Sequence, residues 1–226
     1  LGLIPVAALL DLPTYQITSQ YCIGAIGEVE SVCLYSDVPI EQVKTIRLDY
    51  QSKTSVMLCK ILMKEFYAKE VIYTAANNDQ ELLDFSEETA SLIIGDRALQ
   101  LNGKTKYRID LAGKWVEMTG LPFVFAAWVS KLKMETIMVS SFNNAVGFGV
   151  HHLVRVIAEM NNEGLDLETY FKKNISYNFD EKKQMGLQLF LDKIKHYKIL
   201  SPKQIRNLRK ADKIEILAGV ITEYKK

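Results

Sequence analysis

The sequence has few cysteines and few histidines, three of each in 226 residues. The cysteines are Cys22, Cys33 and Cys59. They form no CxxC pair and have apolar neighbours, which favours buried free thiols and indicates a reducing, cytoplasmic location. The histidines are His151, His152 and His196. They have no cysteine or carboxylate at ligand spacing, so the sequence predicts no metal site.

Long apolar runs are also missing. The longest, Leu121 to Val129, is far shorter than the roughly 20 residues that a membrane-spanning helix needs. The opening residues, Leu1 to Leu10, lack the basic start and the cleavage pattern of a signal peptide. The sequence therefore predicts neither a membrane span nor export. It opens with Leu1 in a stretch typical of a buried strand, from which we expect that an N-terminal segment is missing.

A concentrated charge of one sign is absent. Lysine and arginine number 28 and aspartate and glutamate 27, a formal net charge of +1. Nucleic acid is a poor candidate partner, because binding to phosphates needs a concentrated basic face. The mild basic cluster near the end is interpreted as a solvated helix surface. It consists of Lys203, Arg206, Arg209, Lys210, Lys213, Lys225 and Lys226.

What the sequence does have is material for a core. Hydrophobic residues make up 48% and charged residues 24%, which is typical of an ordinary globular protein. Short strand patterns alternate with helical patterns as far as Lys133, and helices dominate after it. Expected strands are 3–7, 26–36, 46–49, 71–73, 90–94, 107–111 and 121–128. Expected helices are 53–66, 79–85, 135–161, 167–174, 181–197 and 202–209. The alternation predicts a parallel sheet with crossover helices, in one large α/β unit or two small lobes.

The hydroxyl cluster Ser52, Thr54 and Ser55 stands at the head of an expected helix. Hydroxyls and free backbone N–H groups at a helix N-terminus suit a carboxylate or phosphate. Simple N-capping by Ser52 is the favoured alternative. The sequence leaves both open.

Gly95 and Asp96 follow an apolar strand directly. Ligands of open parallel sheets bind beyond the carboxyl ends of strands, and a glycine lets a ligand approach the backbone. Asp96 is thus a candidate acceptor or base. The alternatives are that it caps the next turn or pairs with Arg97.

Several segments together resemble the chorismate dehydratase family of the futalosine route to menaquinone. They are Leu3-Ile4-Pro5-Val6, Cys22-Ile23-Gly24, Gly27-Glu28-Val29-Glu30-Ser31-Val32, Leu48-Asp49-Tyr50-Gln51-Ser52-Lys53-Thr54-Ser55, Ile94-Gly95-Asp96-Arg97-Ala98-Leu99, Asp110-Leu111-Ala112-Gly113-Lys114-Trp115 and Thr119-Gly120-Leu121-Pro122-Phe123 with its continuation to Trp128. Ile175-Ser176-Tyr177 and Gly186-Leu187 resemble the family as well. The resemblance covers nearly the whole chain, but the family's opening Ser/Tyr/Asn-rich motif has no match.

The resemblance implies the two-lobed α/β fold of type II periplasmic binding proteins, with a ligand cleft between the lobes and a helical C-terminal region. Residues 1–44 and 120–226 would form one lobe and residues 45–119 the other. The hinge and return crossing would lie in Thr119 to Trp128.

The implied activity is a lyase reaction that removes water from chorismate to give 3-[(1-carboxyvinyl)oxy]benzoate. The small-molecule substrate is the expected partner, and no cofactor is expected because aromatisation drives the reaction. The resemblance implies substrate contacts by Ser31, Ser52, Thr54, Ser55 and Gly95. The proton acceptor is either Asp96 or the substrate's own side-chain carboxylate.

Two other functions share this fold. A 1,4-dihydroxy-6-naphthoate synthase-like enzyme would rely on a histidine of the second lobe, and residues 46–120 contain no histidine. A non-catalytic solute-binding protein would normally carry an export signal, which the opening residues lack. A dehydration assay with chorismate discriminates between these possibilities.

Overall fold

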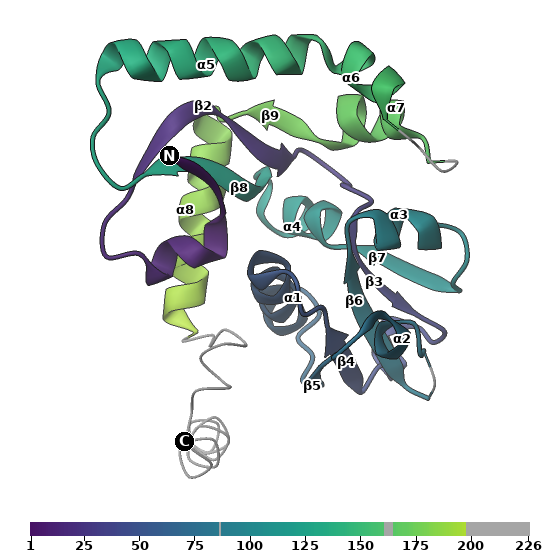
Figure 1. Ribbon diagram of the computed structural model, residues 1–226. Coiled ribbons are helices and arrows are strands. Elements are labelled where there is room, and N and C mark those ends of the chain that lie inside the picture. Colours follow the sequence, from purple (N-terminus) through teal and green to yellow (C-terminus); the bar gives the residue numbers. More distant parts are fainter. Residues whose placement is uncertain (86, 161–164, 198–226) are drawn as a thin grey trace.

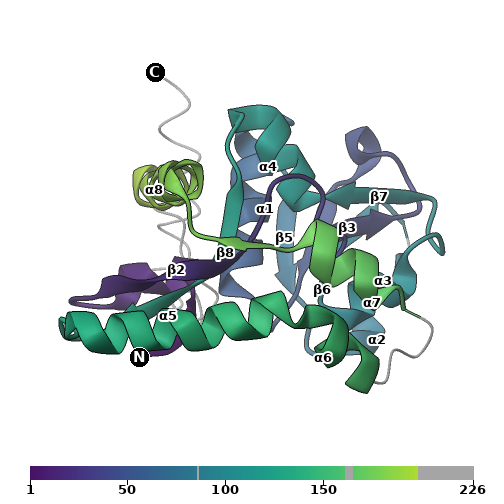
Figure 2. The same ribbon diagram turned by 90° about the horizontal axis from the view of Figure 1, so that it is seen from above.

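Two β-sheets, joined twice by the chain, organise the computed structural model, which describes residues 1–85, 87–160 and 165–197 (Figure 1). The first sheet has four strands in the order β1-β8-β2-β9, and every neighbouring pair is antiparallel. Its strands are β1 (Gly2–Pro5), β2 (Gln16–Ala25), β8 (Phe123–Ser130) and β9 (Ser176–Asn178). Helices α5 (Thr136–His151) and α8 (Glu181–His196) cover its opposite faces (Figure 2).

The second sheet has five strands in the order β5-β4-β6-β3-β7. They are β3 (Val32–Ser36), β4 (Thr45–Leu48), β5 (Ile72–Ala75), β6 (Thr89–Ile94) and β7 (Tyr107–Asp110). Strand β4 is parallel to β5 and β6, whereas β3 is antiparallel to β6 and β7. The expected parallel sheet with crossover helices is therefore confirmed only for β5-β4-β6.

The remaining elements are mostly short helices. They are the 3₁₀ helices η1 (Val6–Asp11) and η2 (Ile40–Gln42), the α-helices α1 (Lys53–Glu65), α2 (Asp79–Leu82), α3 (Asp96–Leu101), α4 (Leu111–Thr119), α6 (Leu153–Glu159) and α7 (Leu167–Thr169), and the π-helical segment η3 (Tyr170–Asn174). Within the described ranges, none of the helices has the length and apolar character needed to cross a membrane.

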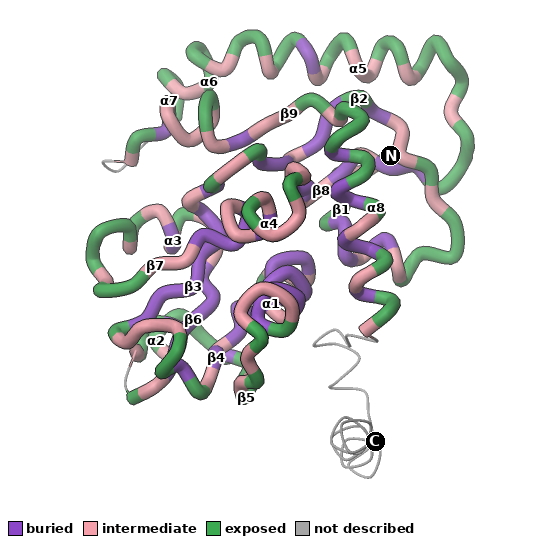
Figure 3. The backbone as a smooth tube through the Cα atoms, turned by 180° about the vertical axis from the view of Figure 1, so that it is seen from behind, coloured by how far each residue is buried: buried purple, intermediate pink, exposed green. Residues whose placement is uncertain are grey.

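One hydrophobic core connects the two sheets. It contains residues of η1, α1, α4, α8 and both sheets, and Figure 3 shows buried backbone on β3, β6, β8 and α1. At its centre Trp115, Phe123 and Phe190 form edge-to-face ring pairs with centroids 4.9 to 5.9 Å apart. Such pairs add roughly 0.5–1.5 kcal/mol each beyond area burial. Trp115 and Phe123 are both fully buried.

The predicted boundary at residue 44 needs correction. Strand β3 pairs with β6 and β7, so residues 32–36 belong to the same sheet as residues 45–110. The first crossing between the sheets lies between Ala25 and Val32 instead, because β2 ends in the first sheet at Ala25 and β3, which pairs with β6 and β7 in the second sheet, begins at Val32. The second crossing runs through α4 and enters β8 at Phe123, within the segment expected for it. A hinge there stays a prediction.

Two strands, β2 and β9, are absent from the expected list. Strand β2 is the central partner of the first sheet, pairing with β8 and β9, and its register shifts twice against β8. Irregular register breaks the alternation by which a strand is recognised.

The expected helix 202–209 and the basic cluster from Lys203 to Lys226 lie outside the described residues.

Candidate functional site

The predicted site residues gather at one edge of the second sheet. Strands β4 and β6 are parallel, so Asp49 and Gly95, which follow them, lie at the same edge. Strand β3 is antiparallel to β6, which brings Ser31 to that edge too. The Gly95 N–H donates to the Ser31 carbonyl at 2.8 Å. The arrangement places the loops that lead into α1, α3 and β3 beside one another.

Ser52 is the N-cap of α1. Its Oγ accepts from the Ser55 N–H at 3.1 Å and lies 2.8 Å from the Ser55 Oγ, to which it donates. Capping, the alternative favoured from the sequence, is therefore present. Ser52 remains partly exposed, so it is accessible to a ligand while it caps α1.

Thr54 and Ser55 are each only 2% exposed. The Thr54 Oγ1 accepts from the Ala7 N–H at 3.2 Å, which connects α1 to η1 of the first sheet's side. Burial and these internal partners show that Thr54 and Ser55 hold the start of α1 in place. The substrate contacts expected for the two hydroxyls stay a prediction.

Asp49 and Arg97 form an ion pair at this edge that the sequence analysis did not find. The Arg97 Nη2 lies 2.6 Å from the Asp49 Oδ2, and its Nη1 pairs with Asp79. Burial raises the pKa of Asp49, while the Gln51 N–H and Arg97 act against the rise. The alternative from the sequence, an ion pair between Arg97 and Asp96, is wrong. The two Nη atoms of Arg97 pair with Asp49 and Asp79 instead.

Gly95 precedes α3 with φ +66° and ψ −147°, a conformation that residues with a Cβ rarely adopt. Asp96 is the first residue of α3 and is exposed. Within the described ranges its carboxylate makes no hydrogen bond or ion pair, so neither structural alternative considered for it is observed. The negative charge at this corner is thus left available.

Asp110, at the end of β7, fixes the segment that carries Ser31. Its Oδ2 accepts from the Val29 N–H at 2.9 Å and the Glu30 N–H at 2.6 Å, and its Oδ1 accepts from the Gly113 N–H at 2.9 Å. Burial raises the pKa of Asp110, and these backbone donors oppose the rise. One buried carboxylate therefore caps α4 and positions the first crossing.

Tyr170, in η3, reaches the site from the side of the first sheet. Its hydroxyl donates to the Ser31 Oγ at 2.9 Å, across 139 residues of sequence. Burial raises the pKa of this hydroxyl; the Ser31 hydrogen bond opposes the rise and the charge of Asp96 adds to it. Asn174 makes a second connection, donating from Nδ2 to the Glu28 carbonyl at 3.2 Å.

Tyr177 lies on β9, three residues after Asn174. Its buried hydroxyl has no hydrogen-bond partner within the described part of the chain. Burial, with a smaller contribution from Tyr170, raises its pKa to about 12. In the sequence, Ile175-Ser176-Tyr177 is recognisable only as part of the resemblance, which assigns Tyr177 no role. No local pattern marks Tyr170, since its hydrogen bond to Ser31 arises from the tertiary fold.

The cysteines and histidines contribute nothing to this edge. All three cysteines are free and buried, and burial raises the pKa of Cys22 and Cys59 to about 12. Such thiols stay protonated and unreactive at neutral pH. Searching the described residues finds no group of three or more His, Cys, Asp or Glu side chains suited to hold a metal ion.

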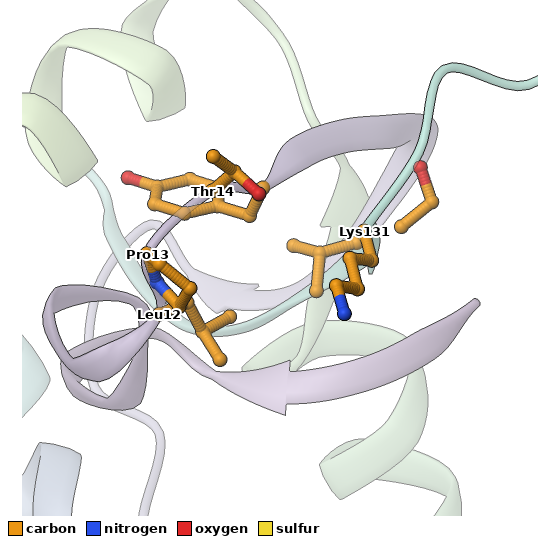
Figure 4. Close-up of a pocket in the computed structure, with 7 residues that line it drawn as sticks. Leu12, Pro13, Thr14 and Lys131 are labelled. Carbon is orange, nitrogen blue, oxygen red and sulfur yellow. The ribbon is translucent and has the colours of Figure 1, made fainter.

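Two hollows in the surface lie elsewhere, around the first sheet. One of about 250 Å³ is lined by Leu12, Pro13, Thr14, Tyr15, Val129, Ser130 and Lys131 (Figure 4). The other, of about 540 Å³, lies between β2, α5 and α8. The first has an almost wholly apolar wall, and neither contains a predicted site residue. The predicted site residues therefore lie at the sheet edge and not in these two hollows.

Comparisons with known proteins agree on one family. The family model described as menaquinone biosynthesis matches residues 1–196. A chorismate dehydratase from Thermus thermophilus is 27% identical over 196 residues, which cover 76% of this chain and 71% of the relative. A chorismate dehydratase from Campylobacter jejuni is 31% identical over 110 residues, 46% of this chain and 49% of the relative.

Among solved structures, protein AF1704 from Archaeoglobus fulgidus has a similar fold. The TM-score is 0.62 at 18% sequence identity, and the match covers 88% of this chain and 79% of the other.

Proposed function

Since the chain belongs to the menaquinone biosynthesis family, we propose that it is a chorismate dehydratase of the futalosine route, which converts chorismate to 3-[(1-carboxyvinyl)oxy]benzoate and water. The names of the two relatives support this reaction. The three buried free thiols support a reducing, cytoplasmic setting.

The observation that carries the proposal is the convergence of Ser31, Gly95 and Asp96 at one sheet edge, with the start of α1 beside them. Chorismate presents two carboxylates and a ring hydroxyl. The partly exposed Ser52 and the N-terminus of α1 suit a carboxylate, through charge-assisted hydrogen bonds and the helix dipole. Ser31 and Gly95 form the neighbouring wall.

Asp96 is the proposed base. The ring C–H bond breaks, its proton passes to the carboxylate and its electron pair enters the ring. The bond to the ring hydroxyl breaks at the neighbouring carbon, and the departing oxygen takes a proton to leave as water. The aromatic ring formed supplies the driving force, so the reaction itself calls for no redox or metal cofactor. The Asp96 carboxylate is exposed and pairs with no cation among the described residues, which supports this role.

We further propose that the two sheets act as two lobes of a type II periplasmic-binding-protein-like fold, with the substrate held at the edge between them. The crossings before β3 and after α4 would connect the lobes. The Tyr170–Ser31 hydrogen bond, which joins η3 to the first crossing, is consistent with closure over a ligand.

The test is to incubate the protein with chorismate and search by mass spectrometry for a product lighter by one water. An aromatic ultraviolet spectrum should appear at the same rate. A protein that binds chorismate without forming this product would support the solute-binding alternative and refute the enzyme. Heat-denatured protein controls for spontaneous decay of chorismate.

A further inference from the structure

Arg97 connects three segments that meet at the sheet edge. It lies in the first turn of α3, two residues after Gly95. Its Nη2 atom lies 2.6 Å from the Oδ2 atom of Asp49, in the loop that follows β4, and its Nη1 atom pairs with Asp79 at the start of α2. The guanidinium therefore joins the loop that leads into α1 to the loop that leads into α3.

The loop after β4 carries Ser52. Asp49 shapes this loop with both of its carboxylate oxygens, because Oδ1 accepts from the Gln51 N–H at 2.7 Å and Oδ2 pairs with Arg97. Ser52 follows Gln51 directly and begins α1 as its N-cap. The place of the Ser52 hydroxyl thus depends on a carboxylate that Arg97 holds.

The two ion pairs of Arg97 differ in their surroundings. The Asp49 side chain is 0% exposed, whereas the Asp79 side chain is 56% exposed. A buried carboxylate that loses its counter-charge is strongly unfavourable, while an exposed ion pair contributes little. Tyr50 also holds Asp79, since its hydroxyl donates to the Asp79 Oδ1 at 3.0 Å. The pair with Asp49 is therefore the one that fixes the loop.

Gly95 is held from the opposite side. Its N–H donates to the Ser31 carbonyl at 2.8 Å, which ties the start of α3 to the segment that enters β3. Arg97 extends from this tied backbone to Asp49, 48 residues away in sequence. One ion pair thus connects the two loops that carry Gly95 and Ser52.

We propose that Arg97 is a positioning residue for the binding of chorismate: through Asp49 it keeps Ser52 and Gly95 at the separation that the bound substrate needs. The inference rests on the proposed function, in which Ser52 and Gly95 contact the substrate. Arg97 itself acts through these residues, because both of its Nη atoms already pair with carboxylates. Without the ion pair, the loop would have to be ordered when the substrate binds, which lowers affinity.

The experiment measures steady-state kinetics and calorimetric binding of chorismate for the 226-residue chain and its variants. Arg97→Met removes the guanidinium and keeps most of the stem. Arg97→Lys keeps a positive charge for Asp49 but cannot hold two carboxylates in a fork. Asp79→Asn removes only the charge of the exposed partner. Should Arg97→Met not fold, Asp49→Asn replaces it, since this variant keeps an oxygen for the Gln51 N–H and loses the charge that Arg97 binds.

Arg47→Met is the matched control. The Arg47 side chain is 23% exposed, close to the 22% of Arg97, and it also forms an ion pair, with Asp84 at 3.0 Å. Asp84 lies outside the loops that carry the proposed substrate contacts. Thermal unfolding of every variant is measured in parallel, so that a general loss of stability is separated from a loss of binding.

The expected result is a split between binding and turnover. Arg97→Met should raise KM and Kd about tenfold or more, with kcat changed less than about threefold, because the loss falls on substrate binding. Arg97→Lys should recover most of the affinity, and Asp79→Asn should change KM less than about threefold. Arg47→Met should unfold at a lower temperature and keep the wild-type KM.

Combining Arg97→Met with Ser52→Gly tests the route of the effect. If Arg97 acts by placing Ser52, the two substitutions remove the same interaction. The double variant should then have a KM within about threefold of the weaker-binding single variant. Effects that multiply to about a hundredfold would show that Arg97 does not act through Ser52.

Three results would overturn the inference. One is a KM that stays at the wild-type value in Arg97→Met while stability falls, and another is a KM that rises equally in Arg47→Met. The third is a wild-type protein that does not bind chorismate, which refutes the proposed function as well. A wild-type protein that binds chorismate but forms no product refutes the dehydratase alone, and tenfold weaker binding by Arg97→Met then still supports the inference.

Discussion

The carboxylate of Asp110 accepts the backbone N–H of Glu30 at 2.6 Å, and Glu30 has a φ of +62°. A left-handed conformation is unfavourable for a residue with a side chain, so an acceptor must hold it. Asp110 supplies that acceptor 80 residues away, at the point where the chain passes from the first sheet to the second. The position of Ser31 thus depends on a residue of β7.

Replacing Asp110 should therefore disturb both the fold and the site. Asp110→Asn puts an amide N–H group in the place of one accepting oxygen, so at least one of the three backbone N–H groups loses its acceptor. We expect the free energy of unfolding at neutral pH to fall by about 1–3 kcal/mol. The measurement is urea unfolding. Asp37→Asn, an exposed position at the opposite sheet edge, is the control and should change nothing.

The same variant has a predictable pH dependence. Burial raises the pKa of Asp110 above its ordinary 3.8. The folded chain therefore binds a proton at Asp110 more tightly than the unfolded chain does. Its contribution to stability is then complete below pH 3.8 and declines as the pH rises through the raised pKa. The gap in unfolding free energy between wild type and Asp110→Asn should narrow over that range, and a gap that widens would contradict the assignment.

Asp96 offers the most direct test of the proposed chemistry. If it is the base, Asp96→Asn should lower kcat by roughly 10²–10⁴ while the substrate still binds. Steady-state kinetics and calorimetric binding of chorismate give the two quantities separately. A loss confined to KM would make Asp96 a binding residue and leave the substrate's own carboxylate as the proton acceptor. Wild-type kinetics would make it a surface residue.

Ser52 has two predicted functions that one substitution separates. Glycine is nearly as good an N-cap as serine, whereas alanine costs about 1 kcal/mol. We therefore expect Ser52→Gly to unfold within a few tenths of a kcal/mol of wild type but to raise the KM for chorismate by about tenfold or more, the usual loss for one charge-assisted hydrogen bond. An unchanged KM in both Ser52→Gly and Ser52→Ala would restrict Ser52 to capping.

Thr54 should behave in the opposite way. Thr54→Val keeps the shape of the side chain and removes the acceptor of the Ala7 N–H, a buried donor. An unpaired buried donor costs about 1–3 kcal/mol, so thermal unfolding should move to lower temperature. The KM should stay at the wild-type value because Thr54 is closed off from ligands. A raised KM without loss of stability would restore the substrate contact that burial argues against.

How much of this was accessible from the sequence depends on the range of the interaction. The apolar spacing of Val56, Cys59 and Met63 predicts α1, and Ser52 is recognisable as its cap, because both signals lie within one helix. The end of β6 at Gly95 is equally local. These local signals predict two of the elements that lie at this edge, the start of α1 and the end of β6.

Long-range partners were not accessible in the same way. Arg97 is adjacent in sequence to Asp96 but pairs with Asp49, because parallel pairing of β4 and β6 brings those two together. The Tyr170–Ser31 bond joins residues 139 apart, and Tyr170 lies in a short π-helical segment with no pattern of its own. Strand β2 was not predicted from the sequence because its register against β8 is irregular.

The last prediction concerns Gly24, which faces Lys183. A Cβ at Gly24 would lie 2.7 Å from the Phe123 carbonyl oxygen and 3.1 Å from the Lys183 Cε. The carbonyl belongs to β8, which pairs with β2 here and has no room to move, so Gly24→Ala should destabilise the fold by about 1–3 kcal/mol, as overpacked cores do. Gly27→Ala, where an added Cβ meets nothing within 4 Å, is the matched control for the backbone change.

Lys183→Met should cost a similar amount by leaving the Ser176 hydroxyl and the Asn178 carbonyl without their donor. A Lys183→Met protein as stable as the wild type would show that these two hydrogen bonds do not stabilise the contact between α8 and β9.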